Sequence, residues 1–334
     1  MEDPRACLPI APFEERAPWF GPDLQTIRNI LAPAPPDLPG GERLLLPVSG
    51  GDRLVARIDG RAAAGARPLI VLVHGLTGSE ESRNVSATAR RLVSEGWPVM
   101  RLNLRGAGPS RATSSGRYHA GRTEDLAAAL RALPPELVRH GIVLVGHSLG
   151  GNLVLKFMGE PWPDTPVLGA VAVSAPLDLA ATSAHMMRPR NVIYHRYLLQ
   201  ALKHEALAPG AGMTAAERST VREARSIFEF DDRFVAPLFG YRDATAYYEA
   251  NSCGRFLNAI DRPTLLIHAL DDPWIPPSAH AALDWSRPAM IETAFSRKGG
   301  HLGFHGRGSP IPWHDRVMTS WLARRPWSPR APLP

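Results

Sequence analysis

A glycine-flanked serine, placed between an apolar run and a helical pattern, constrains the fold of this chain more than any other feature. Gly146-His147-Ser148-Leu149-Gly150 follows the strand-like run 142–145 and precedes a helical pattern at 152–158. Such a serine is held on a sharp turn, and flanking glycines keep neighbouring Cβ atoms out of it. The pattern predicts that Ser148 projects from the end of a buried strand, where a helix amino terminus favours negative charge. The alternative is a glycine-rich turn with an ordinary N-cap serine.

Short apolar runs alternate with helical patterns through most of the chain. The expected strands are 68–73, 98–104, 142–145, 168–174, 263–269 and 289–294, and the expected helices are 86–96, 123–133 with Thr123 as N-cap, and 152–158. This alternation predicts an α/β fold with a mostly parallel central sheet and helices on both faces. Functional groups are then expected at the carboxyl ends of the strands.

The alternation stops between residues 176 and 260, where only helical patterns occur, at 191–207 and 215–230. A segment of this length is not a plain connection. We therefore expect a helical cap at 176–260, inserted into a core formed by 43–175 and 261–325. Prolines gather at both ends of the chain and predict an extended or loop-rich arm at 1–42 that packs on the core, and a tail at 326–334.

Several aromatic residues of the expected cap have two interpretations. They either line a pocket for an acyl group or form the core of the cap. The residues are Tyr194, Tyr197, Phe228, Phe234 and Phe239.

A serine hydroxyl is a poor nucleophile without a base, and the motif around Ser148 predicts an acid and then a histidine later in the chain. The strand-like run 263–269 leads directly into Asp271-Asp272-Pro273. Either aspartate stands at a strand end, where a carboxylate orients a histidine. The one that does not do so is expected to form hydrogen bonds within the turn.

The expected base is His301, which follows Gly299-Gly300 in a loop after the last strand. The two glycines let the backbone come close to the site. His305 is the competitor in the same loop. His268 lies within a strand and is interpreted as a core residue, and the His147 side chain should leave the opposite side of the nucleophile turn.

Two backbone amides are expected to stabilise an oxyanion. One is the amide of Leu149, directly after the serine. The other is the amide of Leu76, in the loop His74-Gly75-Leu76-Thr77-Gly78 that follows the run 68–73. The alternative is that His74-Gly75 only terminates this strand.

These motifs together resemble the YheT-like branch of the α/β-hydrolases, which is related to the abhydrolase-domain esterases and lipases. The similarity includes the motifs above and Pro22-Asp23-Leu24-Gln25-Thr26-Ile27, Asn103-Leu104-Arg105-Gly106, Phe230-Asp231-Asp232-Arg233, Ala236-Pro237-Leu238 and Tyr247-Tyr248. The resemblance implies an α/β-hydrolase fold and hydrolysis of carboxylic esters by a Ser-Asp-His triad. Those roles fall on Ser148, Asp272, which stands four residues before Pro276, and His301. Asp23 stands where the family usually has histidine, which leaves the role of the arm open.

Other chemistry on the same three side chains remains an alternative, namely thioester, amide or phospholipid hydrolysis. A non-catalytic ligand-binding protein on this scaffold is a further alternative. The expected substrate is a short- to medium-chain acyl ester or a lipid. The sequence specifies neither the acyl-chain length nor the oligomeric state.

Composition and missing motifs exclude other classes of protein. The net charge is +6, but the basic residues are scattered and no nucleic-acid motif occurs, so we expect no nucleic-acid partner. No phosphate-binding loop or metalloprotease motif is present, so no cofactor or metal is expected. Cys7 and Cys253 do not form a disulfide framework. Without a signal peptide or an apolar stretch of membrane-spanning length, the chain is expected to be soluble and cytoplasmic.

Overall fold

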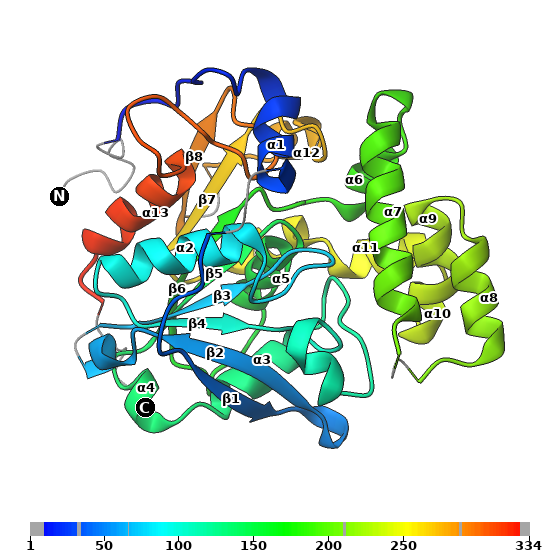
Figure 1. Ribbon diagram of the computed structural model, residues 1–334, viewed down its shortest axis with the longest axis horizontal. Helices are drawn as coiled ribbons and strands as arrows, with labels where there is room; N and C mark the ends of the chain where they lie inside the picture. Colours follow the sequence, from blue (N-terminus) through cyan, green and yellow to red (C-terminus); the bar gives the residue numbers. More distant parts are fainter. Residues whose placement is uncertain (1–9, 32–34, 66, 210–211, 287–288, 328–334) are drawn as a thin grey trace.

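The computed structural model describes residues 10–31, 35–65, 67–209, 212–286 and 289–327, and an eight-stranded sheet lies at its centre (Figure 1). The strand order is β1-β2-β4-β3-β5-β6-β7-β8. Only β2 runs against its neighbours in the sheet. The strands are β1 Glu42–Pro47, β2 Arg53–Asp59, β3 Leu69–Val73, β4 Val99–Leu102, β5 Ile142–His147, β6 Val167–Val173, β7 Thr264–Ala269 and β8 Ile291–Ser296.

Helices cover both faces of the sheet because its central strands are apolar on both sides. In β3, Leu69 and Val71 belong to one core cluster and Ile70 and Leu72 to the other. The first cluster also takes side chains from α3 (Thr123–Arg131) and α5 (Leu149–Gly159). The second takes side chains from α2 (Arg83–Ser94) and α13 (Trp313–Ala323). This is the burial pattern of a parallel sheet covered on both faces.

The elements expected from the sequence are present, with shifted ends. The expected strand 98–104 is shorter in the structure, because β4 ends at Leu102. The helices α2 and α5 each begin three residues before the expected starts at 86 and 152. Thr123 was expected to be an N-cap, which is wrong: it is the first residue of α3, and Arg122 holds the cap position. Its hydroxyl instead contacts Glu160 and the Gly121 carbonyl.

The strands β1 and β2 and the helix α1 (Gly21–Leu31) were not expected. β1 is an edge strand whose residues are mostly exposed, so it lacks a strong apolar signal. The expectation of an extended or loop-rich arm is wrong for residues 21–31. Pro22 is compatible with helix because it stands in the first turn, where a proline leaves no intrahelical hydrogen bond unmade.

All regular elements described between β6 and β7 are helical, and we call residues 179–251 the cap. Figure 1 shows these helices gathered beside the sheet, at the right of the view. They are α6 Leu179–Met186, α7 Val192–Leu207, α8 Ala215–Glu223, α9 Ile227–Phe230, a π-helical turn Asp231–Val235, α10 Ala236–Leu238 and α11 Ala244–Asn251. One helix was expected at 215–230, and this is wrong: Thr214 caps α8 and Ser226 caps a separate helix, α9.

Short elements complete the described chain. They are α4 Pro135–Val138, α12 Ser278–Ala281 and 3₁₀ turns at Ser49–Gly51, Arg61–Gly65, Gly108–Ala112, Pro189–Asn191, Cys253–Arg255 and Leu257–Ala259. Within the described ranges, no helix has the length and apolar character needed to cross a membrane. Cys7 and residues 328–334 of the expected tail lie outside the described residues.

Candidate active site

Ser148 stands on a strained turn between β5 and α5. Its backbone has φ 53° and ψ −121°, a conformation that residues other than glycine rarely adopt. The flanking glycines are sterically required: a Cβ on Gly146 would lie 2.2 Å from the Gly150 carbonyl oxygen, and one on Gly150 would lie 2.4 Å from the Val73 carbonyl oxygen. The turn therefore directs the Ser148 hydroxyl away from the sheet, at the amino terminus of α5.

The structure brings three sequence-predicted side chains into one hydrogen-bonded chain. His301 Nε2 lies 3.0 Å from Ser148 Oγ, and His301 Nδ1 lies 2.8 Å from Asp272 Oδ2. Because an ionised carboxylate only accepts, Nδ1 carries the proton and Nε2 is free to accept one from the serine. Asp272 and His301 are both almost fully buried. This arrangement can activate a hydroxyl as a nucleophile.

Asp272 is kept ionised although it is buried. Burial opposes its charge, but the neighbouring His301 and the hydrogen bond between them outweigh this effect and lower the pKa of the Asp272 carboxyl. The other carboxylate oxygen, Oδ1, accepts hydrogen bonds from the amides of Trp274 (2.8 Å) and Ile275 (3.1 Å). The Trp274 ring stacks on the imidazole of His301 with 4.3 Å between ring centroids. The stacking and the hydrogen bonds together fix the orientation of the imidazole ring.

Asp271, the alternative acid, points elsewhere. Its Oδ1 accepts a hydrogen bond of 2.9 Å from the Gly300 amide, and burial raises the pKa of its carboxyl to about 6. The expectation of hydrogen bonds within the turn is wrong for Asp271, because its partner lies in the loop that carries His301 and the amides of the turn donate to Asp272 instead.

The other candidate histidines lie away from Ser148. His305 contacts Arg28 and Asn29. His268 is a fully buried strand residue that stacks on His280. The buried His147 ring lies on the opposite side of the nucleophile turn, near Thr88 and His314.

The helix α1 positions the loop that carries His301. The sequence had left open the role of the arm that contains this helix. The His301 amide donates to Thr26 Oγ1 over 2.8 Å, and Asn29 Nδ2 donates to the Leu302 carbonyl over 2.6 Å. Gln25 Oε1 accepts from the His305 amide over 2.7 Å. A Cβ on Gly300 would lie 2.5 Å from the Pro22 carbonyl oxygen, so the loop and the helix are in direct backbone contact. The Pro22–Ile27 motif was the signal for this role.

The two backbone amides that were expected to stabilise an oxyanion are both available to donate a hydrogen bond. Leu76 forms no backbone hydrogen bond with the described part of the chain, and Leu149 is the first residue of α5, where helix amides lack an internal partner. The loop that carries Leu76 is fixed by its neighbours. The Thr77 amide donates to the Tyr118 hydroxyl over 2.7 Å, and that hydroxyl lies 3.1 Å from Glu205 of α7. Tyr118 was not found from the sequence.

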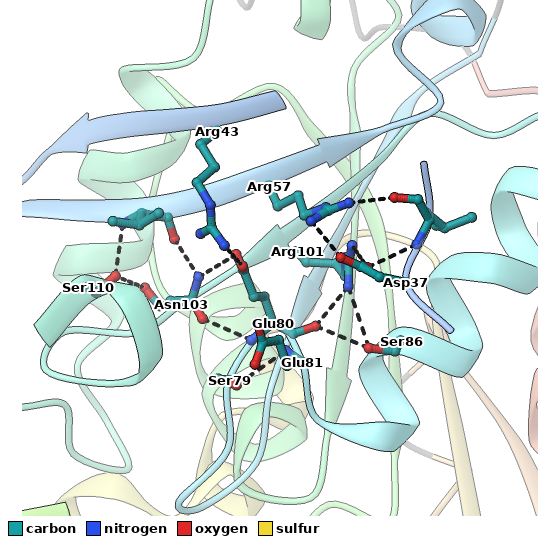
Figure 2. Close-up of polar contacts among 12 residues, drawn as sticks. Asp37, Arg43, Arg57, Ser79, Glu80, Glu81, Ser86, Arg101, Asn103 and Ser110 are labelled. Carbon is teal, nitrogen blue, oxygen red and sulfur yellow. Dashed lines mark hydrogen bonds and ion pairs between the residues drawn. The ribbon is translucent and has the colours of Figure 1, made fainter. Parts of the chain in front are cut away.

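Both ends of the Leu76 loop are attached to the sheet by side chains. At its start, His74 Nε2 accepts a hydrogen bond from the Leu104 amide over 3.1 Å. At its end, Figure 2 shows Glu80 within a buried polar cluster. The Glu80 amide donates to Asn103 Oδ1 over 2.8 Å, and Arg101 donates to the Glu80 carbonyl over 3.1 Å. The Asn103 motif noted in the sequence therefore supports this loop.

A small pocket of about 120 Å³ opens onto Ser148 and His301 between the core and the cap. Its apolar lining includes Leu76, Leu149, Leu179, Met186, Leu198, Leu202, Ile227, Trp274 and Ile275, and its polar lining includes Thr182, Ser183, Asp231, Tyr247 and Tyr248. Among the described lining residues, none is one of the five aromatic residues considered for an acyl pocket. Tyr194 and Phe234 belong to the core of the cap, and Tyr197 is 49% exposed.

No three histidine, cysteine, aspartate or glutamate side chains of the described residues lie close enough together to hold a metal ion.

Known proteins resemble this chain in sequence or in fold. A family model described as the alpha/beta hydrolase fold matches residues 68–307. The chain is 36% identical over 290 residues to the Escherichia coli (strain K12) protein named "Putative esterase YheT", which covers 85% of this chain and 84% of that protein. The chain belongs to the α/β-hydrolase fold family. The fold and the family predicted from the motifs are thereby confirmed.

Further relatives of the family match most of this chain but less of their own length. A Dictyostelium discoideum abhydrolase domain-containing protein is 30% identical, with 77% of this chain and 66% of that protein covered. A Saccharomyces cerevisiae monoacylglycerol lipase is 26% identical, with 77% and 59% covered. Among solved structures, the Pyrococcus furiosus esterase Pf2001 has the same fold, with a TM-score of 0.57, 18% identity and coverage of 88% of this chain and 97% of that one.

Proposed function

We propose that this protein is a serine hydrolase that cleaves carboxylic esters through a covalent acyl-enzyme. The observation that carries the proposal is the continuous hydrogen-bonded chain from Ser148 through His301 to Asp272, with distances of 3.0 and 2.8 Å. The membership of the α/β-hydrolase fold family and the esterase and lipase names of its relatives support it.

The reaction follows from the chemistry of these groups. His301 Nε2 takes the proton of Ser148 as Oγ forms a bond to the ester carbonyl carbon. The Leu76 and Leu149 amides stabilise the resulting oxyanion. When the bond to the alcohol oxygen breaks, His301 returns the proton to the leaving alcohol. A water molecule then attacks the acyl carbon and gives a proton to His301. When the bond between the acyl carbon and Ser148 Oγ breaks, His301 passes this proton to Oγ, which releases the acid and the free serine.

The pocket favours short or medium acyl groups. Its volume of about 120 Å³ is well below the roughly 300–1,000 Å³ typical of ligand pockets, and its lining is mostly aliphatic. A longer acyl chain would have to extend beyond this pocket. We therefore propose that activity is highest on esters with short acyl chains.

A fluorophosphonate probe tests the proposal directly, because it labels only an activated serine. We expect labelling of one site, Ser148, shown by intact mass and peptide mapping, and its loss in Ser148→Ala. A series of p-nitrophenyl esters of increasing chain length should give a maximum at short chains. Matched thioester and amide substrates should be cleaved more slowly. Retained ester hydrolysis in a correctly folded Ser148→Ala variant would refute the assignment.

A further inference from the structure

A carboxyl group lies in the mostly aliphatic pocket in front of Ser148. Asp231 lines this pocket together with Ser148 and His301, and it comes from the π-helical turn of the cap. π-Helical turns are rare and occur frequently at functional sites. The proposed mechanism does not use this side chain.

Asp231 is half-buried, and one of its two carboxylate oxygens has a hydrogen-bond partner among the described residues. The Tyr248 hydroxyl donates to its Oδ2 over 2.6 Å. The same hydroxyl lies 3.1 Å from Ser183 Oγ, so the three groups form a short polar chain. Within the described part of the chain, Asp231 has no ion-pair partner and its Oδ1 accepts no hydrogen bond. The side chain is only partly buried, so this second oxygen is available to a polar group that binds in the pocket.

The protonation state of Asp231 suits recognition of a neutral group. Burial raises the pKa of its carboxyl to about 7, against the lowering effect of the Tyr248 hydrogen bond. Near neutral pH the group therefore exists in part as a carboxylic acid, which both donates and accepts hydrogen bonds. A substrate hydroxyl also donates and accepts, so the two groups match.

We propose that Asp231, supported by Tyr248, is a polar subsite that binds a hydroxyl group of the substrate, and that the preferred substrates are hydroxyl-bearing esters. The inference rests on the proposed ester hydrolysis at Ser148. The hydroxyl group belongs either to the acyl part or to the alcohol part of the ester, and the two sources are separated by the substrates below. A hydrogen-bonding subsite discriminates strongly against an analogue that lacks the hydroxyl, because its own polar groups are then left unpaired.

Matched substrate pairs test the subsite. Ethyl β-hydroxybutyrate against ethyl butyrate probes the acyl side, and the butyrate monoester of ethylene glycol against propyl butyrate probes the alcohol side. The readout is the ratio of kcat/KM within each pair. We expect the wild-type ratio to favour the hydroxylated ester by about tenfold or more in one pair.

Variants assign this preference to Asp231. Asp231→Leu should lower the ratio to near one, and Tyr248→Phe, which keeps the ring, should lower it several-fold. Asp231→Asn should keep most of the preference, because an amide still donates and accepts. The matched control is Asp232→Asn: Asp232 accepts from the Ala244 amide and does not line the pocket, so the ratio should not change.

Other outcomes overturn the inference separately from the proposed function. Ratios near one in the wild type, or ratios unaffected by both Asp231→Leu and Tyr248→Phe, contradict a hydroxyl subsite while ester hydrolysis stands. A preference for the cationic ester butyrylcholine that disappears in Asp231→Asn indicates a charge subsite instead. Calorimetric binding of the same ester pairs to Ser148→Ala needs no turnover, so it tests the subsite even if ester hydrolysis at Ser148 is refuted.

Discussion

The hydroxyl of Thr26 accepts a hydrogen bond of 2.8 Å from the backbone amide of His301. The same hydroxyl donates to the Pro22 carbonyl over 2.7 Å, so its orientation is fixed from within α1. The two residues are 275 positions apart in the sequence. Through this contact, the amino-terminal helix sets the position of the imidazole that we propose as the base.

Thr26→Val should slow the reaction without weakening substrate binding. The change removes the acceptor for the His301 amide, and an unsatisfied buried amide costs about 1–3 kcal/mol. We expect kcat to fall about tenfold with KM nearly unchanged. Thr26→Ser keeps the hydroxyl and should restore most of the activity. An equal loss in both variants, or a loss confined to KM, would contradict a positioning role.

Asp272→Asn and Asp271→Asn should separate the two adjacent aspartates. Asn at 272 removes the charge that stabilises a protonated His301, and by analogy with serine proteases kcat should fall about 10³–10⁴-fold. Asn at 271 keeps an oxygen that accepts from the Gly300 amide, so kcat should fall less than about tenfold. Steady-state kinetics on one activated ester measures both. The reverse order would transfer the orienting role to Asp271.

Tyr118→Phe should weaken the site that stabilises the oxyanion. The variant removes the acceptor of the Thr77 amide and the link to Glu205 of the cap. Loss of one oxyanion donor costs about 10²–10³ in kcat, so displacement of the neighbouring loop should cost less, about tenfold. Tyr197→Phe is the control, because Tyr197 is an exposed tyrosine of the cap helix that carries Glu205. Equal kinetics for the two variants would rule out this coupling.

Buried histidines should make the protein sensitive to mild acid. Burial lowers the pKa of His74, His147 and His268 to about 4, and of His280 and His314 to about 3. Each is neutral in the folded state but takes a proton on unfolding below its usual pKa near 6.5. Their contribution to stability is therefore present above about pH 6.5 and is lost as the pH falls towards 4, by about 1 kcal/mol per histidine at pH 5.5.

Carboxyl groups with raised pKa values act in the opposite direction. Burial raises the pKa of Asp231 to about 7 and of Asp271 and Asp315 to about 6, so each destabilises the fold as the pH rises through this range. The histidines outnumber them, and we expect the midpoint of thermal unfolding to be lower at pH 5.5 than at pH 7.5. His280→Phe, which retains an aromatic ring against His268, should reduce this difference. An unchanged midpoint in the wild type would contradict the prediction.

The sequence specified the parallel part of the sheet and the three side chains that meet at its edge, because both depend on local signals. The apolar runs of β3, β5 and β7 are buried on both faces, and the turn at Ser148 admits only glycine at positions 146 and 150. Each of these signals lies within a few consecutive residues.

The features that the sequence did not predict depend on contacts between distant segments of the chain. The helix α1 was missed because the prolines of the arm suggested a loop, and its buried residues Gln25 and Thr26 are polar. Their partners lie in the His301 loop. The subsite at Asp231 was missed for a similar reason: it needs Tyr248 and Ser183 from other helices of the cap.

The dependence of the His301 loop on α1 has a consequence for synthesis of the chain. An isolated helix of 11 residues is marginal in water, and α1 packs on residues near position 300. A growing polypeptide emerges from the ribosome with its amino end first, so α1 cannot contact the His301 loop until residues near position 300 have been translated. A nascent chain therefore remains inert towards esters until α1 and the His301 loop have met.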